Sequence, residues 1–236
     1  MRSGIWLVAV ALAACSPQQK RAPQAQEGVA VTNTVPGPVP PETAPEPALP
    51  PPPIVVAKAS DLPAAPDGAL TVDGWGPIRI GMTLDELNAV TGSNITLADD
   101  PFYQDGECTY VTPKGAPEGL AIMFADGRVT RIDIEKRGVV TYGGLGIGST
   151  EAEVRRVFGK NLNSEPEYYD GLPAEYLTIW TVFTDWPRGA AETPELLLGH
   201  HAARGLRFET GIDGEEGKVT GFRAGDGSIR FVEGCS

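Results

Sequence analysis

The residues whose types could do chemistry are few, and their spacing does not suit it. The glycine-rich stretch 143–150 precedes an expected helix, where backbone amides can bind phosphate. It fits neither Gly-x-Gly-x-x-Gly nor the P-loop, so we interpret it as a structural turn. His200 and His201 are adjacent, and adjacent side chains point apart on a strand or helix and rarely share a metal.

No Gly-x-Ser-x-Gly motif occurs, and the acidic loop 99–107 lacks the spacing of a calcium loop. We therefore predict no catalytic residue, no metal and no cofactor, and we expect a protein that is not an enzyme. A hydrolase that uses unplaced carboxylates is the less favoured alternative.

The N-terminus indicates export and lipid attachment. Arg2 and the apolar run 5–12 have the charge and length of a signal peptide, because the run is too short to span a bilayer. The sequence Leu12-Ala-Ala-Cys15 resembles the lipobox of bacterial lipoproteins, which implies cleavage before Cys15 and lipid on that residue. Ser16 resembles the class that is sorted to the outer membrane, facing the periplasm. An ordinary cleaved signal peptide with a coincidental cysteine is the alternative.

Two cysteines remain, Cys108 and Cys235. An even number of cysteines in an oxidising compartment predicts one disulfide, which would tie the C-terminus to the first half of the domain. Two free buried thiols are the alternative.

Residues 16–66 differ in composition from the rest of the chain. They hold 14 of the 22 prolines and no aromatic residue, so they cannot bury a core. We expect an extended, disordered segment with polyproline-II character, either a tether that holds a domain away from the membrane or a linker with no role of its own.

The charge distribution restricts the partners. Residues 1–66 carry four basic and four acidic side chains, so the net charge of −12 lies in residues 67–236. Nucleic-acid binding needs a basic face, and we therefore expect no nucleic-acid partner. A cationic partner fits this charge, as does acidity that serves only solubility.

One stretch of the chain occurs twice. Residues 76–95 and 143–162 match without a gap at an offset of 67, which indicates a duplicated structural unit. The matched pairs are Ile78/Leu145, Ile80/Ile147, Gly81/Gly148, Thr83/Thr150, Glu86/Glu153, Leu87/Val154, Val90/Val157, Gly92/Gly159 and Asn94/Asn161.

The duplicated stretch predicts a short helix in each copy. Thr83 with Glu86, and Thr150 with Glu153, have the Thr-x-x-Glu spacing of a capping box. Apolar residues three or four apart give each helix one apolar stripe, and Gly92 and its counterpart Gly159 stand where a left-handed residue would end the helix.

Strands are expected after each helix. Residues 108–111, 120–124 and 129–134 read as strands, with a type I′ turn at Asp126-Gly127, Val129 on the face of Arg131, and Thr130 on the opposite face. Strands at 176–182, 206–210 and 219–223 follow the second helix, and a last hairpin leads to a strand at 229–232. Residues 183–204 have no counterpart in the first copy and are expected to be an insertion.

The duplicated Ile-Gly-Met-Thr-x-x-Glu-Leu pattern resembles the BLIP/BamE-like superfamily, also called SmpA/OmlA. This resemblance implies an α+β fold of two tandem repeats, each a short helix packed on a three- to four-stranded antiparallel meander. It also implies a sheet face or loops that bind another protein. The predicted domains are a lipoprotein signal peptide at 1–15, a tether at 16–66, repeat one at 67–142, and repeat two at 143–236.

The expected function is non-enzymatic protein binding by a lipid-anchored envelope protein, as an inhibitor or a scaffold, with an envelope or secreted protein as partner. A glycan- or peptidoglycan-binding lipoprotein is the alternative. Tyrosine and tryptophan anchor many interfaces, so aromatic residues in or beside the loops are the candidate binding surface. These are Phe102, Tyr103, Tyr168, Tyr169, Trp180 and Trp186.

Overall fold

The computed structural model describes residues 54–97, 108–182, 203–212 and 215–235. The chain divides into residues 1–49 and residues 50–236, and everything described here belongs to the second unit. The predicted signal peptide, Cys15 and most of the predicted tether therefore lie outside the described residues. Within the described ranges, no helix is long and apolar enough to cross a membrane.

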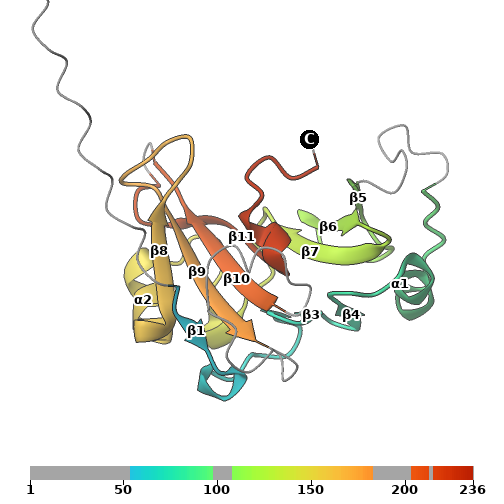
Figure 1. Cartoon of the computed structure of the whole chain (residues 1–236), viewed down its shortest axis with the longest axis horizontal. Helices are drawn as coiled ribbons and strands as arrows, with labels where there is room; N and C mark the ends of the chain where they lie inside the picture. Colours follow the sequence, from blue (N-terminus) through green and yellow to red (C-terminus); the bar gives the residue numbers. More distant parts are fainter. Residues whose placement is uncertain (1–53, 98–107, 183–202, 213–214, 236) are drawn as a thin grey trace, which may run out of the picture. The chain divides into compact units, whose positions relative to one another are not determined.

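The described residues form a mixed α and β fold with few helices and one large sheet (Figure 1). The elements are β1 Val56–Ala57, η1 Ala59–Asp61, β2 Leu70–Thr71, β3 Gly74–Trp75, β4 Ile78–Arg79, α1 Leu84–Thr91, β5 Cys108–Val111, β6 Leu120–Ala125, β7 Arg128–Ile134, η2 Tyr142–Gly144, α2 Glu151–Phe158, η3 Gly159–Asn161, β8 Leu162–Pro166, β9 Glu175–Val182, β10 Ala203–Thr210, β11 Val219–Gly225 and η4 Gly227–Arg230.

Eight of the described strands form the large sheet, in the order β1-β9-β10-β11-β7-β6-β5, with β8 paired to β9 on the same side as β1. Strands β5 to β7 form one antiparallel meander, and β8 to β11 form another. The two meanders meet where β7 and β11 pair antiparallel, with Asp133 opposite Arg223. Strands β2, β3 and β4 form a separate small sheet.

Each helix begins with a capping box. The Thr83 hydroxyl accepts a hydrogen bond from the Glu86 N–H at 3.3 Å, and the Glu86 carboxylate accepts one from the Thr83 N–H at 2.8 Å. Thr150 and Glu153 make the same pair of bonds at 3.2 and 2.8 Å. These bonds satisfy N–H groups that have no partner within the helix.

The helix ends differ. Gly92 takes the expected left-handed conformation, with φ 62° and ψ 28°. Gly159 has φ 53° but ψ −126°, and it begins η3 instead of closing a left-handed cap. The chain thereby continues without a loop into β8, a strand that the sequence analysis did not predict.

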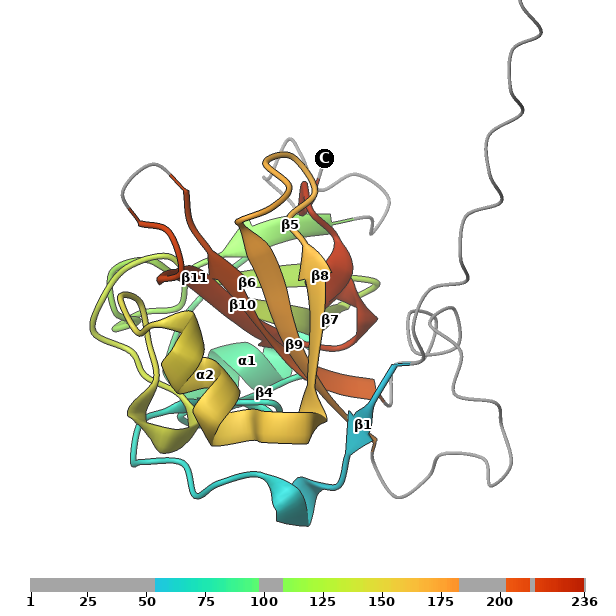
Figure 2. The same cartoon turned by 90° about the vertical axis from the view of Figure 1, so that its left-hand side faces the viewer.

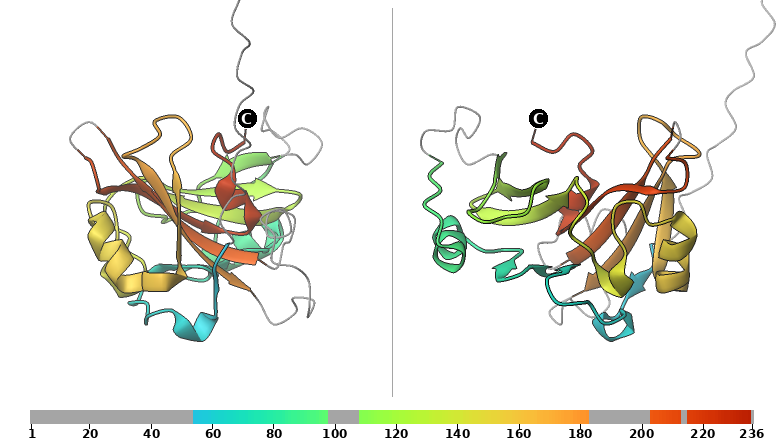
Figure 3. Two further views of the ribbon diagram at one scale, coloured as in Figure 1. Left: turned by 60° about the vertical axis from the view of Figure 1, so that its left-hand side comes forward. Right: turned by 180° about the vertical axis from the view of Figure 1, so that it is seen from behind.

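One face of the large sheet packs on the helices and forms the core. Leu87 of α1 and Val154 and Phe158 of α2 belong to the same buried cluster as alternate residues of β6, β7, β9, β10 and β11. The two helices lie toward opposite ends of the sheet (Figures 1 and 3). Both helices therefore bury apolar side chains in one continuous core, which is what helices this short require.

Strand β7 departs from the predicted alternation. The turn at Asp126-Gly127 is as expected, since Ala125 pairs with Arg128 across these two residues, and Phe124 pairs with Val129, but Met123 pairs with Arg131. Thr130 is thus an extra residue in a β-bulge. The bulge places Val129 in the core, so the prediction that Val129 shares the face of Arg131 is wrong.

The folded unit begins earlier than predicted. Val56 and Ala57 pair in parallel with Trp180 and Thr181 of β9, inside the segment that was expected to be a disordered tether (Figure 2). The Asn163 side chain accepts a hydrogen bond from the backbone N–H of Val55 at 2.7 Å and donates one to its carbonyl at 2.8 Å. An apolar segment at the end of the proline-rich stretch thus extends the sheet edge.

The boundary of the predicted insertion also differs. Its last two residues, Ala203 and Arg204, pair with Val182 and Thr181 as the start of β10. The remainder, 183–202, lies outside the described residues together with His200 and His201.

The last predicted strand is a 3-10 helix instead. Asp226 accepts a hydrogen bond from the Ser228 N–H at 2.9 Å, and this local bond favours a turn over a strand. Ile229 of the resulting η4 lies over Gly205 and Gly225, which are neighbours on β10 and β11. A Cβ at either glycine would press on Ile229, so the two glycines let η4 approach the sheet closely.

Candidate binding cavity on the open face of the sheet

The sheet face opposite α1 and α2, here called the open face, carries a cross-strand row of polar residues. Asp133 of β7 lies opposite Arg223 of β11, Arg223 opposite Arg207 of β10, and Arg207 opposite Thr178 of β9. They alternate along their strands with core residues, because successive side chains point to opposite faces. All four are buried, so each charge requires a partner.

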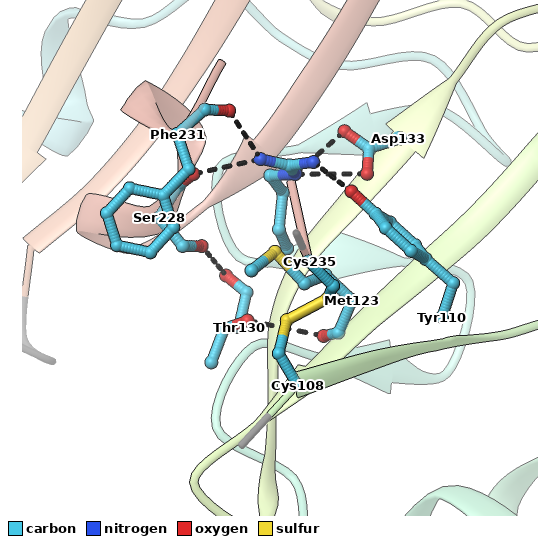
Figure 4. Close-up of a disulfide and its surroundings, with 9 residues drawn as sticks. Cys108, Tyr110, Met123, Thr130, Asp133, Ser228, Phe231 and Cys235 are labelled. Carbon is cyan, nitrogen blue, oxygen red and sulfur yellow. Dashed lines mark hydrogen bonds and ion pairs between the residues drawn. A yellow bond between two sulfur atoms is a disulfide. The ribbon is translucent and has the colours of Figure 1, made fainter. Parts of the chain in front are cut away.

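Arg131 holds the C-terminal segment, residues 226–235, on the open face (Figure 4). Its Nε lies 2.9 Å from Asp133 Oδ1, and its Nη1 donates to the carbonyl oxygens of Ser228 and Phe231 at 3.0 Å each. Its Nη2 donates to the Tyr110 hydroxyl. Hydrogen bonds to a charged group contribute about 1.5–3 kcal/mol each, so this guanidinium strongly stabilises the segment in its place on the open face.

Two further arginines are paired in the same way. Arg223 forms an ion pair with Glu209 and donates to the Phe231 carbonyl at 3.0 Å. Arg207 pairs with Glu165 and lies over the Tyr176 ring at 4.4 Å from its centroid. Burial lowers the pKa of Arg223, and it lowers the pKa of Arg207 to about 10, so Arg207 remains charged at neutral pH.

A cavity of about 440 Å³ opens above this row. Its volume lies within the range typical of ligand sites. Its floor is the sheet, and its walls come from the β8–β9 loop (residues 167–174) and the C-terminal segment. The residues that line it are Tyr110, Ala121, Arg131, Asp133, Ile134, Glu135, Glu167, Tyr169, Tyr176, Glu209, Gly221, Phe222, Arg223, Val232, Glu233 and Gly234.

Two tyrosine–glutamate pairs form the wall. The Tyr176 hydroxyl donates to Glu167, and the Tyr169 hydroxyl donates to Glu233 of the C-terminal segment. Burial and the bond to Glu167 raise the pKa of Tyr176 to about 12. The bond to Glu233 is the main cause that raises the pKa of Tyr169 to about 12.

Two opposing effects act on the pKa of the Glu167 carboxyl. Burial raises its pKa, but hydrogen bonds from Tyr176 and from the backbone N–H groups of Tyr169 and Asp170 outweigh burial, and the net effect lowers the pKa. At neutral pH the wall therefore holds two protonated phenols and the ionised carboxylate of Glu167.

A disulfide joins the C-terminal segment to the edge of the sheet. Cys108 of β5 is bonded to Cys235, as predicted, across a sequence separation of 127 residues (Figure 4). Together with Arg131 and Arg223, this bond places Val232, Glu233 and Gly234 over one end of the cavity.

The aromatic residues predicted to form a binding surface differ in position and exposure. Tyr168 and Tyr169 lie in the β8–β9 loop and are 73% and 62% exposed, and Tyr169 lines the cavity. Trp180 is 2% exposed and packs with Ala203 and Ile229, so its assignment to a binding surface is wrong. It lies on β9 beneath η4, and the sequence did not show that η4 covers it. Phe102, Tyr103 and Trp186 lie outside the described residues.

Several cavity residues were missed by sequence reasoning. Tyr110, Glu209, Arg223 and Glu233 come from separate strands and from the C-terminus, so no local motif unites them. The alternation of β7, which places Arg131 on one face, was the available signal. This alternation indicated that one face of β7 is polar. It did not show that the C-terminal segment covers one end of that face.

The chemical groups that the cavity presents are mostly hydrogen-bond acceptors. The pKa values of Tyr169 and Tyr176 are raised, so neither phenol is an activated nucleophile. The cavity offers instead carboxylate oxygens, phenol oxygens and aromatic ring faces. Comparisons of the chain with protein-family models, curated proteins and solved structures found no match.

Proposed function

We propose that this protein is a lipid-anchored envelope protein whose open face binds another protein without catalysing a reaction, as an inhibitor or a scaffold. The observation that carries this proposal is a rim of exposed apolar and aromatic side chains around a charged cavity. We define the rim as two exposed residues that line the cavity, Tyr110 and Tyr169, and three exposed residues close to the lining in sequence, Tyr168, Leu172 and Phe231.

The rim residues share one neighbourhood. Tyr110 and Tyr169 line the cavity, Tyr168 and Leu172 belong to the same loop as Tyr169, and Phe231 adjoins the C-terminal residues that line the cavity. The exposed fractions are between 41% and 73%, so water contacts much of each side chain. Large apolar side chains gathered beside a polar cavity are typical of a binding surface, and tyrosine is common among energetically dominant interface residues.

The arrangement of the sheet supports the proposal that the unit consists of two tandem BLIP/BamE-like repeats. Each capped helix is followed by an antiparallel meander, and the meanders join through their last strands, β7 and β11. The cavity lies across this junction, because Asp133 and Arg223 form its floor. In this proposal, the two repeats together form one binding face, and each repeat contributes half of it.

The envelope location rests on the lipobox-like sequence that ends at Cys15, which lies outside the described residues. A glycan- or peptidoglycan-binding role is the second candidate, since tyrosines and carboxylates can also bind sugars. The Tyr168 and Tyr169 rings meet edge to face, with centroids 5.1 Å apart. They form no shared flat platform for stacking on a sugar, and this geometry favours a protein partner.

Site-specific photocrosslinking tests the proposal. Benzoylphenylalanine at Tyr168 should crosslink to one protein species of defined mass in intact envelopes. The matched control is the same group at Val90, which is 41% exposed on α1, away from the cavity. A second Tyr169→Ala change should reduce the Tyr168 crosslink, and the thermal midpoint of unfolding should fall only slightly, because the bond from Tyr169 to Glu233 that it removes is exposed.

The opposite outcomes would reject protein binding by the open face. These are identical crosslink patterns from positions 168 and 90, or crosslinks from position 168 to muropeptides alone. The second of these would favour the peptidoglycan-binding alternative.

A further inference from the structure

We propose that the cavity on the open face receives a basic side chain, lysine or arginine, of the protein partner. This inference rests on the proposed function and specifies the chemistry of its partner.

The charge of the cavity lining favours a cation. Its five carboxylates are opposed by two guanidinium groups, which leaves three negative charges uncompensated within the lining. The carboxylates are those of Asp133, Glu135, Glu167, Glu209 and Glu233. The walls exclude part of the solvent, so this charge acts on a ligand with less screening than at an open surface.

The two arginines of the lining are already paired within the chain. Arg131 donates to Asp133, to Tyr110 and to two backbone carbonyls of the C-terminal segment. Arg223 bonds to Glu209 and to the Phe231 carbonyl. An anionic ligand would have to break these buried pairs, which is costly because it leaves a buried charge without its partner.

The carboxylate oxygens of the cavity, in contrast, can accept further hydrogen bonds. Glu135 is exposed at the cavity, and no described side chain bonds to its carboxylate. Glu233 and Glu167 receive phenol donors, but each carboxylate oxygen has more than one lone pair. An ammonium group has three donors and a guanidinium group has five, so both match a cavity rich in acceptors.

The tyrosines add a second feature that suits a cation. Tyr110, Tyr169 and Tyr176 line the cavity, and each hydroxyl is already hydrogen-bonded within the chain, so these residues offer a ligand ring surface and oxygen lone pairs in place of donors. A cation over a tyrosine ring is attracted by the negative face of the ring. Arg207 already makes this contact with Tyr176 from within the chain, 4.4 Å from the ring centroid.

The test is calorimetric titration of the full chain, solubilised in detergent, with blocked tripeptides that carry arginine, glutamine or glutamate between two glycines. We expect measurable binding of the arginine peptide, which weakens as the salt concentration rises. The glutamine and glutamate peptides should bind at least tenfold more weakly. The same titration with a lysine peptide should resemble that with arginine.

Matched variants locate the site. Glu135→Gln combined with Glu233→Gln should weaken arginine-peptide binding about three- to tenfold, as expected for removing charges near the ligand. Asp67→Asn, an exposed carboxylate remote from the cavity lining, should change it less than twofold. If the double variant has a lowered thermal midpoint, the Glu135→Gln single variant is used to test binding instead. This substitution should not disturb the fold, because the exposed Glu135 carboxylate bonds to no described side chain.

The inference is overturned if the glutamate peptide binds as well as the arginine peptide, or if Asp67→Asn and the double variant have equal effects. Its failure is distinguishable from failure of the proposed function. A Tyr168 crosslink that persists in the double variant preserves protein binding and rejects the basic side chain. A peptide that binds in the cavity without any rim crosslink rejects the rim as the docking surface.

Discussion

Replacing Thr83 or Thr150 with alanine tests both the helix caps and the continuity of the two halves. Each hydroxyl accepts one hydrogen bond from a backbone N–H of its helix, at 3.3 Å for Thr83 and 3.2 Å for Thr150. Alanine leaves that N–H without its side-chain partner. The expected loss is about 0.5–2 kcal/mol in the free energy of unfolding for each substitution.

The structure predicts how these losses appear on heating. Leu87 of α1 and Val154 of α2 lie in the same buried cluster, so the two halves should unfold together. A loss of 1 kcal/mol lowers the midpoint by about 2–4 °C in a folded unit of this size, so each variant should lose about 1–8 °C. Differential scanning calorimetry should show one transition in both variants.

The serine variants are the matched controls. Thr83→Ser and Thr150→Ser keep the hydroxyl and should remain close to the parent midpoint. The reasoning would be refuted if the alanine variants matched their serine controls. Two separate transitions, of which each alanine variant moves only one, would refute the single continuous core.

The same caps make a pH-dependent contribution. Hydrogen bonds from Thr83 lower the pKa of Glu86, and those from Thr150 lower the pKa of Glu153, below the ordinary value of 4.5. A carboxyl with a lowered pKa stabilises the fold above its unfolded pKa, and this contribution is lost as the pH falls through the folded pKa. Glu86→Gln should therefore flatten the decrease in stability below pH 4.5, as measured by urea unfolding at several pH values.

Three further predictions concern the two ends of the folded unit and the proposed lipid anchor. Replacing both Cys108 and Cys235 with serine should lower the free energy of unfolding by up to about 5 kcal/mol. Hydrogen exchange should increase first in the C-terminal segment. Unchanged exchange there would contradict the interpretation that the disulfide fixes this segment on the sheet. Asn163→Ala removes both bonds to Val55 and should cost about 1–3 kcal/mol, with loss of exchange protection confined to β1 and its neighbours. Cys15→Ser should abolish lipid labelling and release the protein into the soluble periplasm, and retention in washed membranes would reject the lipobox interpretation.

Features that depend on a few neighbouring residues could be predicted from the sequence. The capping boxes lie within four residues of chain, and the structure has both. The turn at Asp126-Gly127 requires positive φ at both positions, and they have 51° and 72°. An apolar stripe at helical spacing likewise predicted that Leu87 and Val154 would be buried.

The disulfide was also predictable, but for a different reason. Its prediction depended on the count of cysteines and the expected compartment, not on geometry. What the bond does could not be read from the count, because that depends on Arg131 and Arg223 fixing the same segment over the sheet.

The cavity was decided by tertiary structure alone. Pairing of β7 with β11 brings Asp133 and Arg223 together from residues that are 90 positions apart in the chain. No local preference specifies that pairing, which results from burying the apolar faces of both halves in one core. The same long-range packing covers Trp180 with η4, which is why a residue with the composition of an interface anchor is part of the interior. Local hydrogen bonds determined the elements of this protein, and the shared core determined which side chains face the cavity.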